Sequence, residues 1–204
     1  MLKKIPMTGM ILAGGKSSRM GKNKALLPLG YGCVLEHLGK IFDAIFAQTL
    51  ILVDDKTKYL SLDLPESFFF EDLVKNRGPL GGLCTGFAYA DYASCFTATC
   101  DMPLIHEPFI RSMINARRIE TGSALCAKNL EGRWEPFPAI YNRENRFLAG
   151  TLRDSGHLSM GRFLEVISVD CWAMPEEFRG VMINMNTPAE YRVVLEKRKV
   201  LCEY

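Results

Sequence analysis

The sequence predicts an α/β fold built on a single doubly wound, mostly parallel sheet. Short apolar segments typical of buried strands alternate with segments that carry apolar residues at helical spacing. This alternation favours parallel strands with helices on both faces of the sheet. Gly14, Asp54, Asp72 and Asp101 each follow one of the predicted strands, at its carboxyl end. Sheets of this type bind ligands at the carboxyl ends of their strands, so these residues predict a site.

The first half of the chain carries most of the predicted strands. Strands are predicted at residues 8–13, 49–53, 67–70 and 94–99. Helices are predicted at residues 34–46, 83–92 and 108–119. Val34, Leu38 and Phe42 illustrate the helical spacing of apolar residues. The glycine-rich stretch 73–82 is predicted to be a loop.

The second half is less regular. A strand is predicted at 123–127, and 134–141 is predicted to be an edge strand or extended segment because its two prolines cannot donate ladder hydrogen bonds. A further strand is predicted at 181–188, followed by a helix that Pro188 opens. Helices are predicted at residues 143–154, 160–166 and 188–199. We expect one domain, 1–204, with a nucleotide-binding half (1–120) and an acceptor-binding half (121–204).

Composition excludes several classes of protein. The 204 residues carry a net charge of only +2, which argues against a nucleic-acid partner. No apolar run reaches the roughly 18 residues that a membrane span needs. The seven cysteines are odd in number and contain no C-x-x-C pair, so a disulfide framework or zinc site is not predicted. We expect a reducing, cytoplasmic location.

The first predicted strand ends in a loop that has the character of a phosphate site. Its apolar residues stop at Gly14-Gly15, and a glycine pair lets successive backbone N–H groups point into one concavity. Four cations follow: Lys16, Arg19, Lys22 and Lys24. The alternative is a basic surface turn. The spacing fits neither the Walker A loop nor the dinucleotide-binding loop.

Three other groups of polar residues have both a functional and a structural interpretation. Asp101 could hold Mg²⁺, which prefers oxygen ligands, or could cap the helix after Pro103. Asp72 could accept hydrogen bonds from a nucleotide sugar or base, or could be a solvated loop acid. Asn184 and Asn186, two apart on a predicted strand end, could face one heterocycle, or Asn186 could cap the last helix.

These motifs together resemble a known family. The stretch 12–24, Leu-Ala-Gly-Gly-x-Ser-x-Arg-Met-Gly-x-x-Lys, resembles the signature loop of nucleotidyltransferases that couple a nucleoside triphosphate to a phosphorylated acceptor. Four later motifs occur in the same order as in the molybdenum cofactor guanylyltransferases: Glu71-Asp72 with 78–82, 100–103, 135–141 and 184–188. The resemblance covers nearly the whole chain.

The resemblance implies transfer of GMP from GTP to molybdopterin carrying molybdenum, with release of pyrophosphate and with Mg²⁺ as cofactor. It implies that Asp101 binds the metal, that Asn184 and Asn186 face the pterin, and that Arg19, Lys24 and Asp101 carry the catalysis. It implies nucleotide contacts from Leu12, Ala13, Gly14, Gly15, Lys24, Asp54, Asp72, Gly78 and Asp101. Position 54 is often Asn in that family. Cofactor-delivering proteins and apo-molybdoenzymes are the implied protein partners.

Two other functions remain open at this point. One is a related nucleotidyltransferase that uses CTP or a sugar or alcohol phosphate. The other is a non-catalytic nucleotide-binding accessory protein. The presence of both Lys24 and Asp101 favours an enzyme over the accessory protein.

Overall fold

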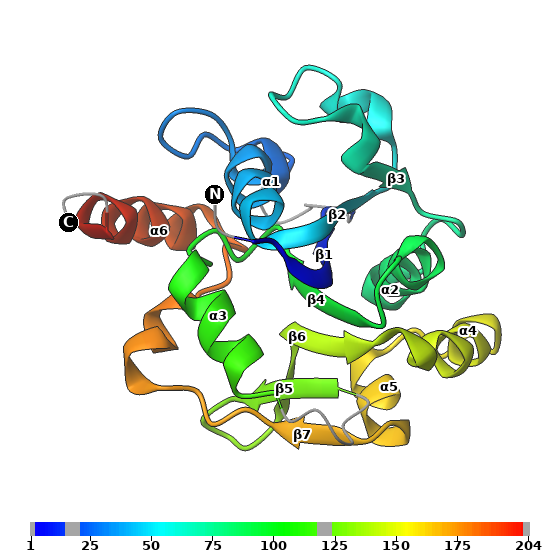
Figure 1. Ribbon diagram of the computed structural model, residues 1–204. Coiled ribbons are helices and arrows are strands. Elements are labelled where there is room, and N and C mark those ends of the chain that lie inside the picture. Colours follow the sequence, from blue (N-terminus) through cyan, green and yellow to red (C-terminus); the bar gives the residue numbers. More distant parts are fainter. Residues whose placement is uncertain (1–2, 15–20, 118–123, 202–204) are drawn as a thin grey trace.

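The computed structural model describes residues 3–14, 21–117 and 124–201. Within them, seven strands form one sheet in the order β3-β2-β1-β4-β6-β5-β7 (Figure 1). The strands are β1 (Ile5–Leu12), β2 (Phe46–Val53), β3 (Phe69–Glu71), β4 (Ser94–Thr99), β5 (Ala124–Lys128), β6 (Trp134–Asn142) and β7 (Val169–Cys171). Neighbouring strands are parallel except where β6 pairs with β4 and with β5. The predicted mostly parallel α/β fold is confirmed.

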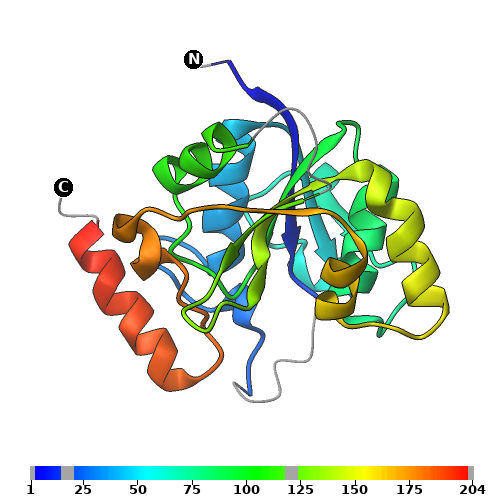
Figure 2. The same ribbon diagram turned by 90° about the horizontal axis from the view of Figure 1, so that it is seen from below.

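Helices cover both faces of this sheet. They are α1 (Val34–Ile45), α2 (Gly78–Tyr89), α3 (Glu107–Asn115), α4 (Arg146–Asp154), α5 (Met160–Val166) and α6 (Pro188–Leu201). In Figures 1 and 2, α1, α3 and α6 lie on one side of the sheet and α2, α4 and α5 lie on the other. No helix in the described ranges is long and apolar enough to cross a membrane.

A helix cap and buried apolar side chains explain why α1 and β2 form where they do. Glu36 accepts a hydrogen bond from the Cys33 backbone N–H at 2.8 Å, which satisfies a donor at the start of α1. The helix buries one apolar stripe against the sheet, as its spacing predicts. Phe42, from α1, packs with Phe46 and Phe96 from β2 and β4 at ring-centroid distances of 5.3 and 5.6 Å. These rings form the centre of the core between α1 and the sheet.

The structure corrects the prediction for residues 73–82. The glycine-rich part, Gly78–Gly82, is the first part of α2 and not a loop. A Cβ atom added at Gly86 would lie 2.5 Å from Sδ of Met10 on β1, and one at Gly82 would lie 3.2 Å from Cδ2 of Leu12. The glycines therefore allow α2 to approach β1 closely.

The structure also corrects two strand predictions. β6 lies inside the sheet and is not an edge strand. Its prolines are tolerated because Cys126 of β5 pairs with Ala139 while its neighbour Ala127 pairs with Glu135, so Pro136 and Pro138 fall in a bulge. The strand predicted at 181–188 is absent: a 3₁₀ helix, Glu176–Val181, is followed by irregular chain up to α6. The edge strand β7 was not predicted, because three residues are too few to show an alternating pattern.

Candidate active site

The four predicted strand-end residues lie at one edge of the sheet. Gly14, Asp54, Asp72 and Asp101 follow the parallel strands β1, β2, β3 and β4, which are adjacent in the sheet. Backbone bonds continue the ladder beyond the strands and fix this edge. They run from Ala13 N to Leu52 O at 2.8 Å, from Asp72 N to Val53 O at 2.9 Å, and from Cys100 N to Leu12 O at 3.0 Å.

Gly14 lies close to both Asp54 and Asp72. A Cβ atom at Gly14 would lie 3.4 Å from Oδ2 of Asp72 and 3.6 Å from the backbone N of Asp54. A Cβ atom at Gly82 would lie 3.7 Å from the other carboxylate oxygen of Asp72. Asp72 therefore lies between two glycines, one after β1 and one in α2, and a Cβ atom at either position would be in van der Waals contact with its carboxylate.

Asp72 has the most perturbed carboxyl group at this edge. Burial is the largest cause that raises its pKa from 3.8 to about 6, and the charge of the neighbouring Asp54 contributes in the same direction. The Thr85 hydroxyl opposes this shift, but it donates its hydrogen bond to the Gly81 carbonyl at 3.1 Å. Oδ1 of Asp72 is buried and has no hydrogen-bond partner among the described residues. A buried acceptor of this kind fits a ligand that supplies a donor.

Asp54 is more open to solvent than Asp72. Its carboxylate pairs with Nζ of Lys58 at 2.6 Å, and both side chains are nearly half exposed. Exposed pairs of this kind contribute little stability and can exchange partners easily. Asp54 is therefore able to face a ligand at the same edge.

Asp101 is held by contacts on both of its carboxylate oxygens. Oδ1 accepts a hydrogen bond from the Thr99 hydroxyl at 2.5 Å, and Oδ2 lies 3.9 Å from Nζ of Lys24. The helix-cap interpretation of Asp101 is wrong, because α3 begins at Glu107 and His106 Nδ1 accepts its capping bond from Phe109 N. The carboxylate lies instead next to the cation predicted to bind phosphate.

Lys24 is positioned by residues that the sequence did not single out. It begins a 3₁₀ helix, Lys24–Leu26, capped by Asn23, whose Oδ1 accepts from Ala25 N at 3.1 Å. Asn23 Nδ2 donates to the Tyr59 hydroxyl at 3.0 Å, and that hydroxyl donates to the Ala13 carbonyl at 3.4 Å. This chain of bonds ties the segment that carries Lys24 to the end of β1.

Asn186 contacts Lys24 directly. Nζ of Lys24 donates to Oδ1 of Asn186 at 2.5 Å. The cap interpretation of Asn186 is wrong, because Thr187 is the residue that caps α6. The Thr187 hydroxyl accepts from Glu190 N at 3.2 Å while Glu190 Oε2 accepts from Thr187 N at 2.8 Å, which is a reciprocal capping box.

Asn184 lines a different part of the molecule. It contributes to a cavity of about 470 Å³ that also contains Lys128, Trp172 and Arg179. Met102 lines the same cavity, and Met185 N donates to the Asp101 carbonyl at 2.7 Å, so the cavity adjoins the Asp101 segment. Its mixture of aromatic, apolar and cationic side chains suits a polar, anionic heterocycle.

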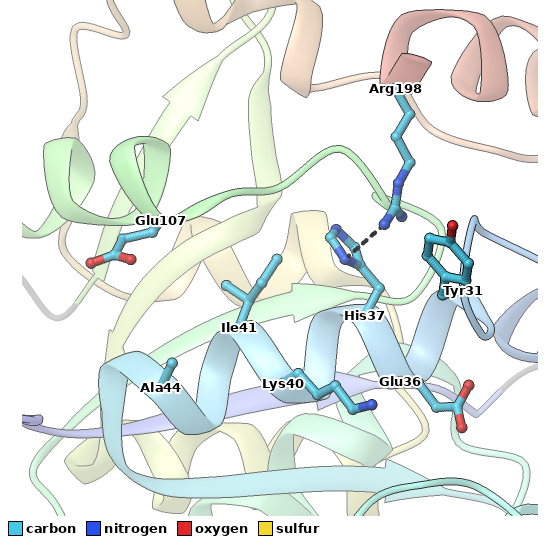
Figure 3. A pocket seen from close by; sticks show the side chains of 8 residues that line it. All are labelled: Tyr31, Glu36, His37, Lys40, Ile41, Ala44, Glu107 and Arg198. Carbon is cyan, nitrogen blue, oxygen red and sulfur yellow. Dashed lines mark hydrogen bonds between the residues drawn. The ribbon is translucent and has the colours of Figure 1, made fainter. Parts of the chain in front are cut away.

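A second cavity, of about 300 Å³, lies between α1 and α6. Figure 3 shows Arg198 of α6 reaching His37 of α1, with 3.3 Å between Nη2 and Nδ1. Burial and, to a smaller extent, the Arg198 charge lower the pKa of His37 from 6.5 to about 4. His37 is therefore neutral at pH 7 and accepts the bond. None of the predicted site residues is among the described residues that line this cavity. The contact between Arg198 and His37 links α6 to α1.

The remaining predicted site residues are less constrained or lie outside the described ranges. Gly78 is the first residue of α2, has a positive φ of 59°, and leaves open space where a Cβ atom would be. Gly15 and Arg19 lie outside the described residues. Leu12 and Ala13 are buried at the end of β1, next to the edge that carries Gly14.

No cluster of three or more His, Cys, Asp or Glu side chains in the described part of the chain could hold a metal ion. A metal at Asp101 would complete its shell with water and with groups of a substrate. This fits Mg²⁺, which usually takes one or two protein carboxylates and completes its shell with water and substrate phosphates.

Comparison with known proteins identifies the family. A model of the MobA-like NTP transferase domain matches residues 9–168. A probable molybdenum cofactor guanylyltransferase from Carboxydothermus hydrogenoformans is 32% identical over 93% of this chain and 95% of its own length. A probable molybdenum cofactor guanylyltransferase from Pelotomaculum thermopropionicum is 36% identical over 96% of this chain and 93% of its own length.

A solved structure has the same fold. The molybdopterin-guanine dinucleotide biosynthesis protein A of Archaeoglobus fulgidus superimposes with a TM-score of 0.80 over 95% of this chain and 99% of its own, at 22% identity. The resemblance predicted from the sequence motifs is confirmed by the family model and by the curated relatives. The chain therefore belongs to the MobA-like NTP transferase family, and it is a nucleotidyltransferase.

Proposed function

We propose that this enzyme transfers GMP from GTP to molybdenum-molybdopterin, forming the molybdopterin guanine dinucleotide cofactor and pyrophosphate. The observation that carries the proposal is the position of the Lys24–Asp101 pair, 3.9 Å apart, directly beside the cavity of about 470 Å³. The hydrogen bond from Met185 N to the Asp101 carbonyl joins the two. The pair proposed to bind phosphate and metal is adjacent to a cavity that could hold a second substrate, and this supports the proposal.

The nucleotide is proposed to lie along the carboxyl edge of β1, β2 and β3. Asp72 offers the buried Oδ1 acceptor to a ribose hydroxyl or a base N–H group, and Asp54 lies beside it. Lys24 is proposed to bind the triphosphate, together with Arg19. The backbone contacts assigned to the nucleotide come from Leu12, Ala13, Gly14, Gly15 and Gly78.

Asp101 is the proposed protein ligand of Mg²⁺. Its Oδ1 is oriented by Thr99, and its Oδ2 faces the Lys24 ammonium, so the carboxylate is fixed where phosphates would meet it. When bound, the metal would neutralise charge on the transferred phosphate and on the leaving pyrophosphate. Mg²⁺ held by one carboxylate is easily exchanged, so turnover should depend on its concentration.

The acceptor is proposed to occupy the cavity that Asn184 lines, with Lys128 and Arg179 facing its phosphate and Trp172 facing its ring system. The assignment of residues 121–204 to the acceptor is supported by the cavity, since these residues line most of it. Proteins that deliver the cofactor, and apo-molybdoenzymes that receive it, are the proposed partners, and the cytoplasm is the proposed location. The six described cysteines are all free, as a reducing compartment would require.

The reaction needs no general base from the protein. The terminal phosphate of the acceptor is already an anionic nucleophile. Its oxygen attacks the α-phosphorus of GTP, a new phosphoanhydride bond forms, and the bond to the β-phosphate breaks to release pyrophosphate. Lys24 and Arg19 stabilise negative charge on the non-bridging and leaving oxygens, and fixed positioning of both substrates supplies much of the rate enhancement.

A panel of nucleotides tests the proposal. Purified protein is incubated with molybdenum-molybdopterin, Mg²⁺ and each of the four ribonucleoside triphosphates, and pyrophosphate release is measured with and without the acceptor. We expect release only with GTP and only when the acceptor is present. Release with CTP instead would support the cytidylyltransferase alternative, and GTP binding without turnover would support an accessory protein.

A further inference from the structure

Asn186 belongs to the phosphate side of the site by its contacts. Its Oδ1 accepts a hydrogen bond from the Lys24 ammonium at 2.5 Å, although the two residues lie 162 positions apart in the sequence. Its backbone N–H donates to Oε2 of Glu190 at 2.7 Å, so Asn186 is fixed to the first turn of α6. The preceding residue, Met185, donates its N–H to the Asp101 carbonyl. Asn186 is therefore held rigidly between the metal-binding segment and α6.

We infer that Asn186 is a positioning residue that holds the Lys24 ammonium for the triphosphate, and that it is not a reader of the pterin. The inference rests on the proposed function, in which Lys24 binds the phosphates of GTP. It assigns the acceptor specificity of the Asn-x-Asn motif to Asn184, whose side chain lines the acceptor cavity.

The chemistry of the contact supports this role. A lysine side chain is long and flexible, and an ammonium 3.9 Å from the Asp101 carboxylate is drawn toward it. The hydrogen bond to Asn186 is a second contact on the ammonium, and it keeps the ammonium at a fixed distance from the Asp101 carboxylate. The amide oxygen is a neutral acceptor, so it orients the ammonium without cancelling the charge that phosphate binding requires. A carboxylate in its place would cancel that charge.

The rigidity of the segment makes the bond useful. Glu190 Oε2 accepts from Asn186 N, from Thr187 N and from the Thr187 hydroxyl, at 2.7, 2.8 and 3.1 Å. These bonds lower the pKa of Glu190, the one to Asn186 N most strongly, so its carboxylate stays charged at neutral pH. The Asn186 backbone is thus fixed independently of Lys24, and it can impose a position on the longer side chain.

A double-mutant cycle on GTP affinity tests the inference. GTP binding is measured by calorimetry, without the acceptor, for wild type, Lys24→Ala, Asn186→Ala and the double variant. We expect Lys24→Ala to weaken binding by about tenfold to a hundredfold and Asn186→Ala by about threefold to tenfold. Since Asn186 acts through Lys24, the double variant should be no weaker than Lys24→Ala within about twofold.

Two further variants separate positioning from other roles. Asn186→Asp keeps the size of the side chain but places a carboxylate on Lys24, and it should weaken GTP binding at least as much as Asn186→Ala. Asn184→Ala is the matched control and should leave GTP affinity unchanged while raising the acceptor KM. Far-UV circular dichroism and melting temperature confirm that each variant is folded.

The outcomes distinguish this inference from the proposed function. Losses that multiply in the double variant, or an Asn186→Ala variant with normal GTP affinity and a raised acceptor KM, would overturn the positioning role alone. A wild-type protein that binds no GTP would overturn the proposed function and the inference with it. Asn186→Asp with wild-type GTP affinity would show that only the size of the side chain matters, and would also overturn the inference.

Discussion

At the scale of single residues, the site depends on side chains that are fixed by bonds from outside their own strand. Asp101 accepts a hydrogen bond from the Thr99 hydroxyl and lies 3.9 Å from Lys24. Lys24 in turn donates a hydrogen bond to Asn186. The types of these residues and their place after β4 and in the first loop could be predicted from the sequence. The bond between Lys24 and Asn186 could not, because it joins segments far apart in the chain that no local pattern relates.

Asp101→Asn tests the metal assignment. The amide keeps the size of the side chain but loses the negative charge that Mg²⁺ needs, so we expect most turnover to be lost and the dependence on Mg²⁺ concentration to weaken. The melting temperature should stay close to that of wild type, because His106 caps α3. Steady-state rates over a Mg²⁺ titration and thermal melts measure both. Wild-type turnover, or loss of the fold, would contradict the assignment.

The raised pKa of Asp72 predicts how GTP binding depends on pH. The Asp72 carboxylate can accept hydrogen bonds from a nucleotide on both oxygens only when it is ionised. Because its pKa is about 6, it becomes protonated as the pH falls through that value. GTP affinity should therefore fall as the pH is lowered from about 7.5 to about 5.5. Asp72→Asn should bind GTP more weakly at pH 7.5 and should lose this part of the pH dependence.

The raised pKa of Asp72 also affects the stability of the fold, and it does so in the opposite direction to its effect on GTP affinity. Because the folded pKa lies above the ordinary value of 3.8, the folded state binds the proton more tightly than the unfolded state does. The ionised group therefore costs stability above about pH 6, and this cost disappears as the pH falls from 6 toward 4. A difference in melting temperature between Asp72→Asn and wild type that does not change over this range would contradict the shift.

At the scale of elements, the errors in prediction have a common physical cause. Gly78–Gly82 was predicted as loop because glycine disfavours helices, yet α2 uses its glycines to approach β1 closely. The prolines of β6 predict an edge strand or an extended segment, yet a bulge places them where no ladder bond is needed. In both cases packing against a neighbouring element overrides local propensity, and the neighbour is not visible in the local sequence.

A matched pair of glycine substitutions tests whether close packing also constrains a glycine of β1 that faces the rings of Phe42 and Phe46. A Cβ atom at Gly9 in β1 would lie 2.4 Å from the Phe46 ring and 2.7 Å from the Phe42 ring, whereas one at Gly150 in α4 would meet nothing within 4 Å. We expect Gly9→Ala to destabilise the protein by about 1–3 kcal/mol through overpacking. Gly150→Ala should be neutral or stabilise it by about 0.5–1 kcal/mol.

Urea unfolding of both variants measures these differences. Equal stabilities for the two alanine variants would mean that the aromatic rings shift without cost. The account of close packing between β1 and α1 would then be wrong.

At the scale of the whole molecule, one sheet brings the two halves of the chain to a common edge. β6, β5 and β7 continue the sheet formed by β3, β2, β1 and β4, so the cavity of about 470 Å³ is built beside the end of β4. The parallel class of this sheet and the grouping of Gly14, Asp54, Asp72 and Asp101 followed from the alternation of elements. The cavity did not follow from it, because most of its walls come from irregular segments after β4, β5 and β7.

The halves are also joined across the site. The bond from Lys24 to Asn186 connects the segment that carries the proposed phosphate-binding lysine to the segment that opens α6. The bond from Met185 to Asp101 connects the segment after β4 to the same place. Arg198 fastens the same helix to α1 at its other end (Figure 3). The proposed division into a nucleotide half and an acceptor half is therefore crossed by residue Asn186.

The central claim is that GMP passes from GTP to the acceptor at the edge that carries Lys24 and Asp101. The most direct measurement follows the phosphorus atoms. GTP labelled at either the α- or the γ-phosphate is incubated with the enzyme, Mg²⁺ and molybdenum-molybdopterin, and the products are separated. We predict that the α label appears in a pterin dinucleotide and the γ label in pyrophosphate, and that Asp101→Asn forms neither. Release of the γ label as orthophosphate, or recovery of all α label in free guanine nucleotides, would contradict the account.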